Sequence, residues 1–84
     1  MNRYIIESPH PPETGDQGLH DLNAAGYLHN FEWGCKDNDH TGWALVEAEN
    51  LEHAKQIVPW YLRDNARIVR LVKFDIVDND HPKT

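Results

Sequence analysis

LHNFEWGCKDNDHTGWALVEAE, which occupies residues 28–49, contains two apolar runs separated by the polar connector Lys36–Asp39. The connector is rich in Asp and Asn, which tolerate turn conformations and hydrogen-bond to their own backbone. The flanking runs hold aromatic and β-branched residues, which suit the pleated surface of a half-buried sheet. This pattern predicts a β-hairpin in which Cys35 ends the first strand and His40 opens the second.

Before the hairpin, the sequence predicts a strand and a helix. Arg3–Ser8 is rich in β-forming residues, and the prolines that follow end the strand because they lack an N–H for the sheet ladder. A helix is expected to begin near Thr14 or Asp16, since Thr14 and Gln17 have the spacing of a capping box. Gly26 is placed to end this helix in the left-handed conformation.

After the hairpin, a second helix and a last strand are predicted. Asn50 is a good N-cap, and apolar residues recur after it at helical spacing until Pro59 interrupts the helix. Arg67–Val77 has the composition of a strand that is apolar on both faces. We therefore expect one domain over residues 1–77 and a polar C-terminal tail over residues 78–84.

The order strand, helix, strand, strand, helix, strand is that of the ferredoxin-like βαββαβ fold, which belongs to the α+β class. Right-handed crossovers place the four antiparallel strands in the order last, first, third, second, with both helices on one face of the sheet. The other face carries Trp43 and Leu45, which are too apolar to be left in water. We therefore expect a second copy to cover it, so that the chain forms a homodimer of the dimeric α+β barrel type.

Length and charge restrict the classes of protein to which this chain can belong. Its 84 residues are enough for one small domain. The net charge of -6 argues against binding to nucleic acid and to an anionic membrane surface. No apolar run approaches the ~20 residues of a transmembrane helix, and the first residues, MNRYIIES, lack the apolar core of a signal peptide. The expected location is the cytoplasm.

The predicted topology brings three metal-ligating side chains to one end of the sheet. His10 follows the first strand, Cys35 ends the second and His40 opens the third. A thiolate with two imidazoles suits a divalent transition metal such as nickel, zinc or copper. Asp37 or Asp39 could add an oxygen ligand. We therefore predict a metal site formed by His10, Cys35 and His40.

Two alternatives to this metal site remain open at the level of the sequence. Cys35 could be a small buried apolar residue, since free cysteine is among the most buried residue types, with both histidines in solvated loops. The three residues could also line a functional pocket that binds no metal. The other four histidines are expected to lie outside the cluster: His20, His29, His53 and His81.

Four segments of the chain resemble a known family. Tyr4–Ser8, Phe31–Cys35, Asp39–Gly42 and Val46–Glu49 look like the corresponding parts of a family of small, uncharacterised bacterial and archaeal ferredoxin-like proteins. More distantly, the chain is similar to nickel-responsive proteins of the same dimeric α+β barrel class. The resemblance implies a ferredoxin-like homodimer. In the nickel-responsive proteins, histidines near the dimer interface bind the metal.

The sequence supports two main hypotheses for function. The first is a small, dimeric, non-catalytic protein that binds nickel, zinc or copper and acts in metal sensing or storage. The alternative is a small cofactor-independent enzyme, similar to a monooxygenase or an isomerase, that uses the cleft between sheet and helices. A plain interaction module is a third hypothesis. The chain has no phosphate-binding glycine loop, nucleophile elbow or Cys-x-x-Cys pair that would point to other chemistry.

Overall fold

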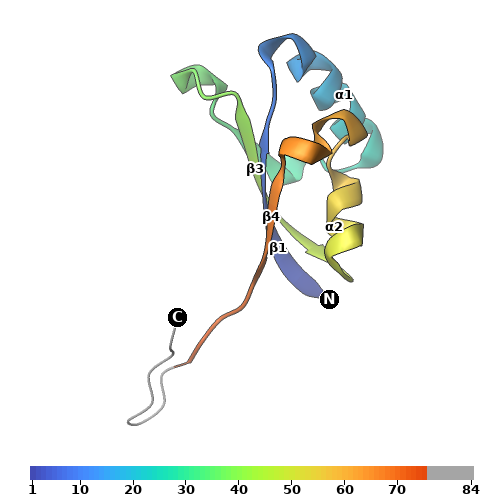
Figure 1. Ribbon diagram of the computed structural model, residues 1–84, viewed down its shortest axis with the longest axis vertical. Coiled ribbons are helices and arrows are strands. Elements are labelled where there is room, and N and C mark those ends of the chain that lie inside the picture. The colour runs from blue at the N-terminus through green and yellow to red at the C-terminus, as the bar shows by residue number, and fades with distance from the viewer. Residues whose placement is uncertain (76–84) are drawn as a thin grey trace.

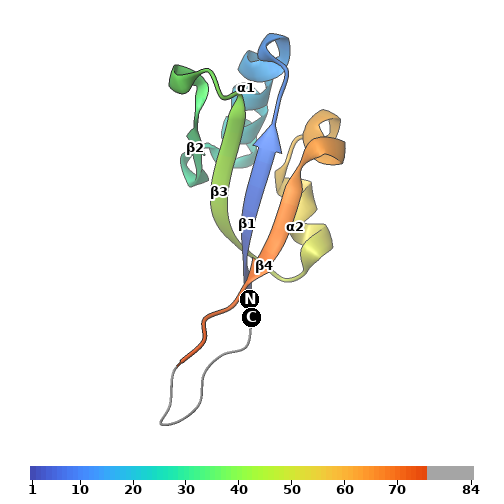
Figure 2. The same ribbon diagram turned by 60° about the vertical axis from the view of Figure 1, so that its left-hand side comes forward.

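A computed structural model describes residues 1–75 of the chain and has a four-stranded antiparallel sheet with helices packed on one face (Figures 1 and 2). The strands are β1 (Asn2–Pro9), β2 (Phe31–Trp33), β3 (Thr41–Ala48) and β4 (Arg67–Leu71), and the helices are α1 (Gly15–Ala25) and α2 (Leu51–Ile57). The strands lie in the order β2-β3-β1-β4, which is the order that the sequence predicts. The predicted C-terminal tail lies outside the described residues.

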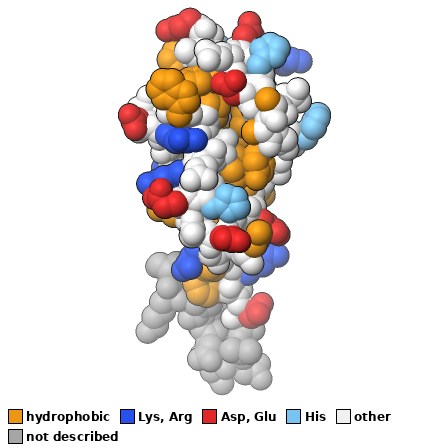
Figure 3. All heavy atoms as spheres, turned by 90° about the vertical axis from the view of Figure 1, so that its right-hand side faces the viewer, with side chains coloured by type: hydrophobic (Ala, Val, Ile, Leu, Met, Phe, Trp, Pro, Cys, Tyr) orange, Lys and Arg blue, Asp and Glu red, His pale blue; other side chains and the backbone are white. Residues whose placement is uncertain are grey.

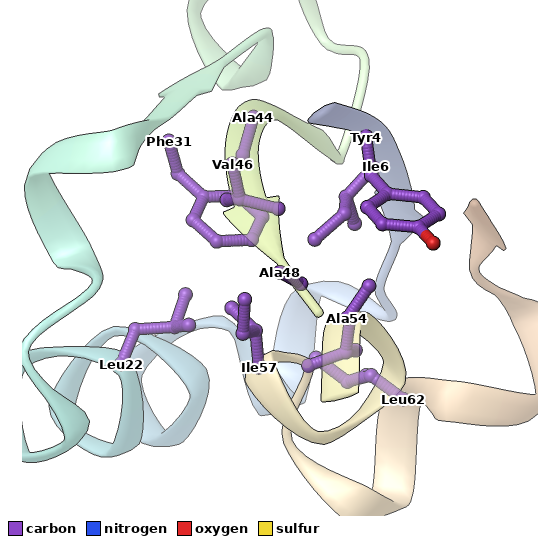
Figure 4. Packing of buried hydrophobic residues seen from close by; sticks show 11 residues of the cluster. Tyr4, Ile6, Leu22, Phe31, Ala44, Val46, Ala48, Ala54, Ile57 and Leu62 are labelled. Atoms are coloured by element: carbon purple, nitrogen blue, oxygen red, sulfur yellow. The ribbon is translucent and has the colours of Figure 1, made fainter. Parts of the chain in front are cut away.

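The hydrophobic core lies between the sheet and the helices (Figure 4). Successive side chains of a strand point to opposite faces, so every second residue of β1 and β3 is buried against the helices. The sheet contributes Tyr4, Ile6, Phe31, Ala44, Val46 and Ala48 to the core. The helical layer contributes Leu22 from α1, Ala54 and Ile57 from α2, and Leu62 from a 3-10 turn at Trp60–Asn65.

The ends of the helices follow local signals, with one difference from the prediction. Asn50 caps α2, because its side-chain oxygen accepts a hydrogen bond from the backbone N–H of His53 at 2.9 Å. Gly26 ends α1 in the left-handed conformation with φ of 86°. The capping box predicted at Thr14 is wrong, because its hydroxyl donates to the carbonyl oxygen of Pro11 at 3.0 Å and makes no cap bond.

The hairpin is shorter than predicted. Its first strand, β2, covers only Phe31–Trp33, because the residues on both sides of it form 3-10 turns. The preceding turn is Leu28–Asn30, which lies between the end of α1 and the start of β2. The following turn is Cys35–Asp37, so Cys35 belongs to the connector and does not end the strand.

The last strand is also shorter than the predicted range Arg67–Val77. β4 ends at Leu71, and residues 72–75 are described without strand structure, while 76 and 77 lie outside the described residues. Leu71 pairs with Arg3, and the partner strand β1 begins only one residue earlier, at Asn2. The strand therefore ends because its partner does. Val72 and Phe74 are consequently exposed.

The two faces of the molecule differ in their cover. On the helical side, acidic and basic side chains are interspersed with apolar patches (Figure 3). On the opposite side the sheet is bare of any helix among the described residues, and the side chains on this face include Leu45, which is 53% exposed. Within residues 1–75, the longer helix has 11 residues, and none is both long and apolar enough to cross a bilayer.

Candidate metal centre

Three segments of the chain meet at one end of the sheet, where β1 finishes (Figure 2). Pro9, the last residue of β1, pairs with Thr41, the first residue of β3, and Trp33 at the end of β2 pairs with Gly42. The pairing continues one residue beyond β1, because the N–H of His10 donates to the carbonyl oxygen of His40 at 2.9 Å. The antiparallel pairing of β1 and β3 therefore places the two histidines side by side.

A compact connector brings the cysteine to the same place. Its base is closed by the N–H of Gly34, which donates to the carbonyl oxygen of Thr41 at 3.1 Å. The carbonyl oxygen of Gly34 in turn accepts from the N–H groups of Asp37 and Asp39. Asn38 takes the left-handed conformation with φ of 62°, which Asn tolerates better than most residues. These bonds hold Cys35 at the start of the turn.

The side chains of His10, Cys35 and His40 form a cluster. One ligand atom from each lies within 4.8 Å of the other two. The Sγ of Cys35 lies 4.0 Å from the Nε2 of His10, and the two imidazole rings are 5.7 Å apart in an edge-to-face arrangement. His10 is only 9% exposed, His40 is half-buried and Cys35 is exposed. The cluster is therefore open to solvent on the side of the thiol.

The spacing of the cluster is close to that of a tetrahedral metal site. Zinc–nitrogen and zinc–sulfur bonds at tetrahedral angles separate neighbouring ligand atoms by roughly 3.3–3.6 Å. The observed separations, 4.0 Å for one pair and at most 4.8 Å for all three, exceed the upper end of that range by about 0.4 Å and by at most about 1.2 Å. The donor set of two nitrogens and one sulfur suits zinc, copper or nickel.

Packing fixes His10 more firmly than its partners. The ring of Trp33 contacts the imidazole edge to face with centroids 5.8 Å apart, and Trp33 stacks on Phe31 at 5.4 Å. The first residue of α1 lies on another side, since a Cβ at Gly15 would be 3.5 Å from the Nε2 of His10. Sequence reasoning missed both neighbours. The only signal in the sequence for these two contacts was position: Trp33 is two residues before Cys35, and Gly15 is the first residue of the helix that follows His10.

The two candidate oxygen ligands, and the other histidines that the structure describes, lie outside the cluster. Asp37 and Asp39 are not in the cluster found within residues 1–75, and Asp39 accepts a hydrogen bond from the hydroxyl of Thr41 at 2.8 Å. His20 is exposed on α1, and the ring of His53 accepts a bond from the N–H of Glu49 at 3.2 Å. His29, which falls within the segment predicted to form the hairpin, lies in the 3-10 turn before β2. His81 lies outside the described residues.

The structure decides one of the sequence-level alternatives. Cys35 is exposed, so its interpretation as a small buried apolar residue is wrong. The reason is the 3-10 turn at Cys35–Asp37, which takes the chain away from the core directly after Gly34. His10, expected to be solvated in the same alternative, is nearly buried.

Comparisons of the chain with protein-family models, with curated proteins and with solved structures found no match. The functional argument therefore depends on the residues of the site.

Proposed function

We propose that this chain is a small, non-catalytic protein that binds a divalent transition metal through His10, Cys35 and His40 and acts in metal sensing or storage in the cytoplasm. The observation that supports the proposal is the convergence of one thiol and two imidazoles from three separate segments within 4.8 Å. Nickel, zinc and copper all accept this donor set. His10 is only 9% exposed, so its side chain is already held in place by packing. It therefore loses little conformational entropy when it binds a metal.

We further propose a ferredoxin-like homodimer. The strand order β2-β3-β1-β4 with helices on one face supports the fold, and the apolar residues of the bare sheet face, of which Leu45 is exposed, support the pairing of two copies. The dimer would cover that face, whereas the metal site lies at the end of the sheet under α1.

The enzyme alternative draws little support from the space between sheet and helices. The enclosed cavity there has a volume of about 10 Å³ and is lined mainly by apolar residues such as Leu22, Phe31 and Leu62. Such a cavity accommodates about one water molecule, which is too small for an organic substrate.

The proposal is tested by metal analysis of protein purified without a histidine tag. We expect the purified protein to carry a transition metal, and calorimetric titration of the metal-free protein with nickel, zinc and copper to show one site per chain. Cys35→Ser should weaken metal binding by more than about tenfold. The loss of a residue that only hydrogen-bonds a metal ligand commonly costs that much, and Cys35 is a ligand itself.

His53→Ala is the control, because it removes a histidine of α2 that lies outside the cluster. The His53→Ala variant should bind the metal with the same affinity as the unaltered chain. Equal affinities of the Cys35→Ser and His53→Ala variants would remove Cys35 from the site.

A further inference from the structure

The three side chains of the cluster line one wall of a surface groove of about 540 Å³. The other walls are formed by Pro12, Leu19, Trp33 and Lys36, together with the first residues of α1. Leu19 is 39% exposed although it is one of the apolar residues of α1. The groove therefore offers apolar surface directly beside a set of metal ligands.

The number of protein donors leaves a metal incompletely coordinated. Within residues 1–75, the cluster supplies three ligand atoms, and Asp39, one of the two predicted oxygen donors, accepts a hydrogen bond from the hydroxyl of Thr41 instead. Zinc sites with four protein ligands are structural, whereas sites with three keep a position for an exchangeable ligand. Since Cys35 is on the exposed side of the cluster, that position faces the groove.

The groove also indicates the class of ligand. Lys36 favours a negatively charged group, as does the metal. Asp16 in the first turn of α1 also lines the groove and disfavours a second negative charge. Pro12, Leu19 and Trp33 favour an apolar body.

We infer that a metal ion held by His10, Cys35 and His40 keeps one exchangeable position that opens on this groove, and that a small monoanion with an apolar body binds there. This inference rests on the proposed metal site. It adds a ligand-binding activity that metal storage does not require.

The test uses the full chain loaded with cobalt(II), whose visible spectrum reports its coordination, and two carboxylate probes, 3-phenylpropanoate and propanoate. We expect both probes to shift the cobalt bands. The phenyl probe should bind at least about tenfold more tightly, since it buries an aromatic ring that propanoate lacks. Leu19→Ser should reduce this preference by more than about threefold and leave propanoate binding unchanged.

Leu51→Ser is the matched control, because Leu51 is an exposed leucine of α2, 43% exposed, outside the groove. It should leave both affinities unchanged. A cobalt–thiolate absorption band without any response to the probes would overturn the inference and leave metal binding intact. Equal affinities of the two probes would overturn the assigned ligand class. Absence of cobalt binding would overturn both the inference and the proposed function.

Discussion

The position of Trp33, and with it that of His10, depends on a glycine. A Cβ at Gly42 would lie 2.5 Å from the Cζ3 atom of Trp33, so Gly42→Ala must displace the indole. We expect a loss of about 1–3 kcal/mol in the free energy of unfolding, as for other overpacked sites. Metal affinity should also fall, because the indole contacts the imidazole of His10. Denaturant unfolding and calorimetric titration measure the two effects.

Gly18→Ala is the control for this glycine. Gly18 lies inside α1, and a Cβ there would meet Leu62 at 3.6 Å, an ordinary contact. Since alanine is the better helix former, we expect this variant to gain about 0.5–1 kcal/mol of stability with unchanged metal affinity. A Gly42→Ala variant that behaved in the same way would show that Trp33 can move without effect on His10.

The ligands should compete with protons for the metal. Binding requires a thiolate at Cys35 and neutral imidazoles at His10 and His40. We expect metal affinity to fall by more than about tenfold from pH 8 to pH 6, because protons compete with the metal for the same ligand atoms. Calorimetric titration over this range should show a shallower dependence for Cys35→Ser, which has one proton fewer to lose. Affinity independent of pH would contradict this ligand set.

At the scale of single residues, the sequence predicted proximity better than environment. His10, Cys35 and His40 could be placed together because strand pairing alone determines which strand ends meet. The burial of His10 and the exposure of Cys35 could not be predicted, because they depend on Trp33, Gly15 and a 3-10 turn. These contacts arise from packing between segments distant in sequence.

At the scale of elements, the two helix starts make a controlled comparison. Asn50 accepts a hydrogen bond from the first turn of α2, whereas Thr14 makes no such bond to α1. Asn50→Ala should therefore cost about 1 kcal/mol of stability, the usual value of an N-cap, and Thr14→Ala clearly less. Denaturant unfolding of both variants checks the difference. Equal losses would indicate that the hydroxyl of Thr14 stabilises its own turn as strongly as Asn50 caps α2.

Of the properties of the helices and strands, the lengths of the strands were the hardest to predict from the sequence. β2 and β4 have the composition of longer strands, but each ends where hydrogen-bonding partners or turn geometry end it. Sequence composition reports whether a residue suits a sheet, and it carries no information on where the neighbouring strand stops. The strand order was predictable, because right-handed crossovers allow few arrangements of these elements.

At the scale of the whole molecule, one hydrogen bond links distant parts of the helical layer. The hydroxyl of Tyr61, in the 3-10 turn before β4, donates to the carboxylate of Asp21 on α1 at 2.6 Å. Burial, this hydrogen bond and the charge of Asp21 raise the pKa of Tyr61 from 10.0 to about 12. The folded chain therefore holds this proton more tightly than the unfolded chain does.

This raised pKa predicts a stability loss in alkali. The contribution of Tyr61 should be complete below pH 10 and should be lost as the pH rises toward 12, through the pKa of the folded state. Tyr61→Phe should be less stable than the unaltered chain at neutral pH by about 1 kcal/mol. Its stability should fall less steeply from pH 10 to pH 12. Denaturant unfolding at several pH values measures both slopes, and parallel slopes would contradict the assignment.

Within residues 1–75, no helix covers the sheet face opposite α1 and α2 (Figures 1 and 2). Ile5, Leu45 and Val69 are paired across β1, β3 and β4, so they form one apolar row. On one side of this row, Arg3 pairs with Glu47, and on the other Glu7 accepts a bond from Trp43 at 3.2 Å. Charges of both signs therefore flank the row, an arrangement that a second copy of the same face can complement.

This arrangement predicts that the chain has twice its mass of 9.7 kDa in solution at micromolar concentration. Leu45→Glu should yield the monomer mass by light scattering, because it would bury a carboxylate in the apolar row of both copies. Leu51→Glu, on α2 and away from this face, should remain dimeric. The Leu45→Glu monomer should still bind metal, because its side chain lies on the sheet face opposite the helices and the cluster. A monomeric mass of the unaltered chain would reject the dimer.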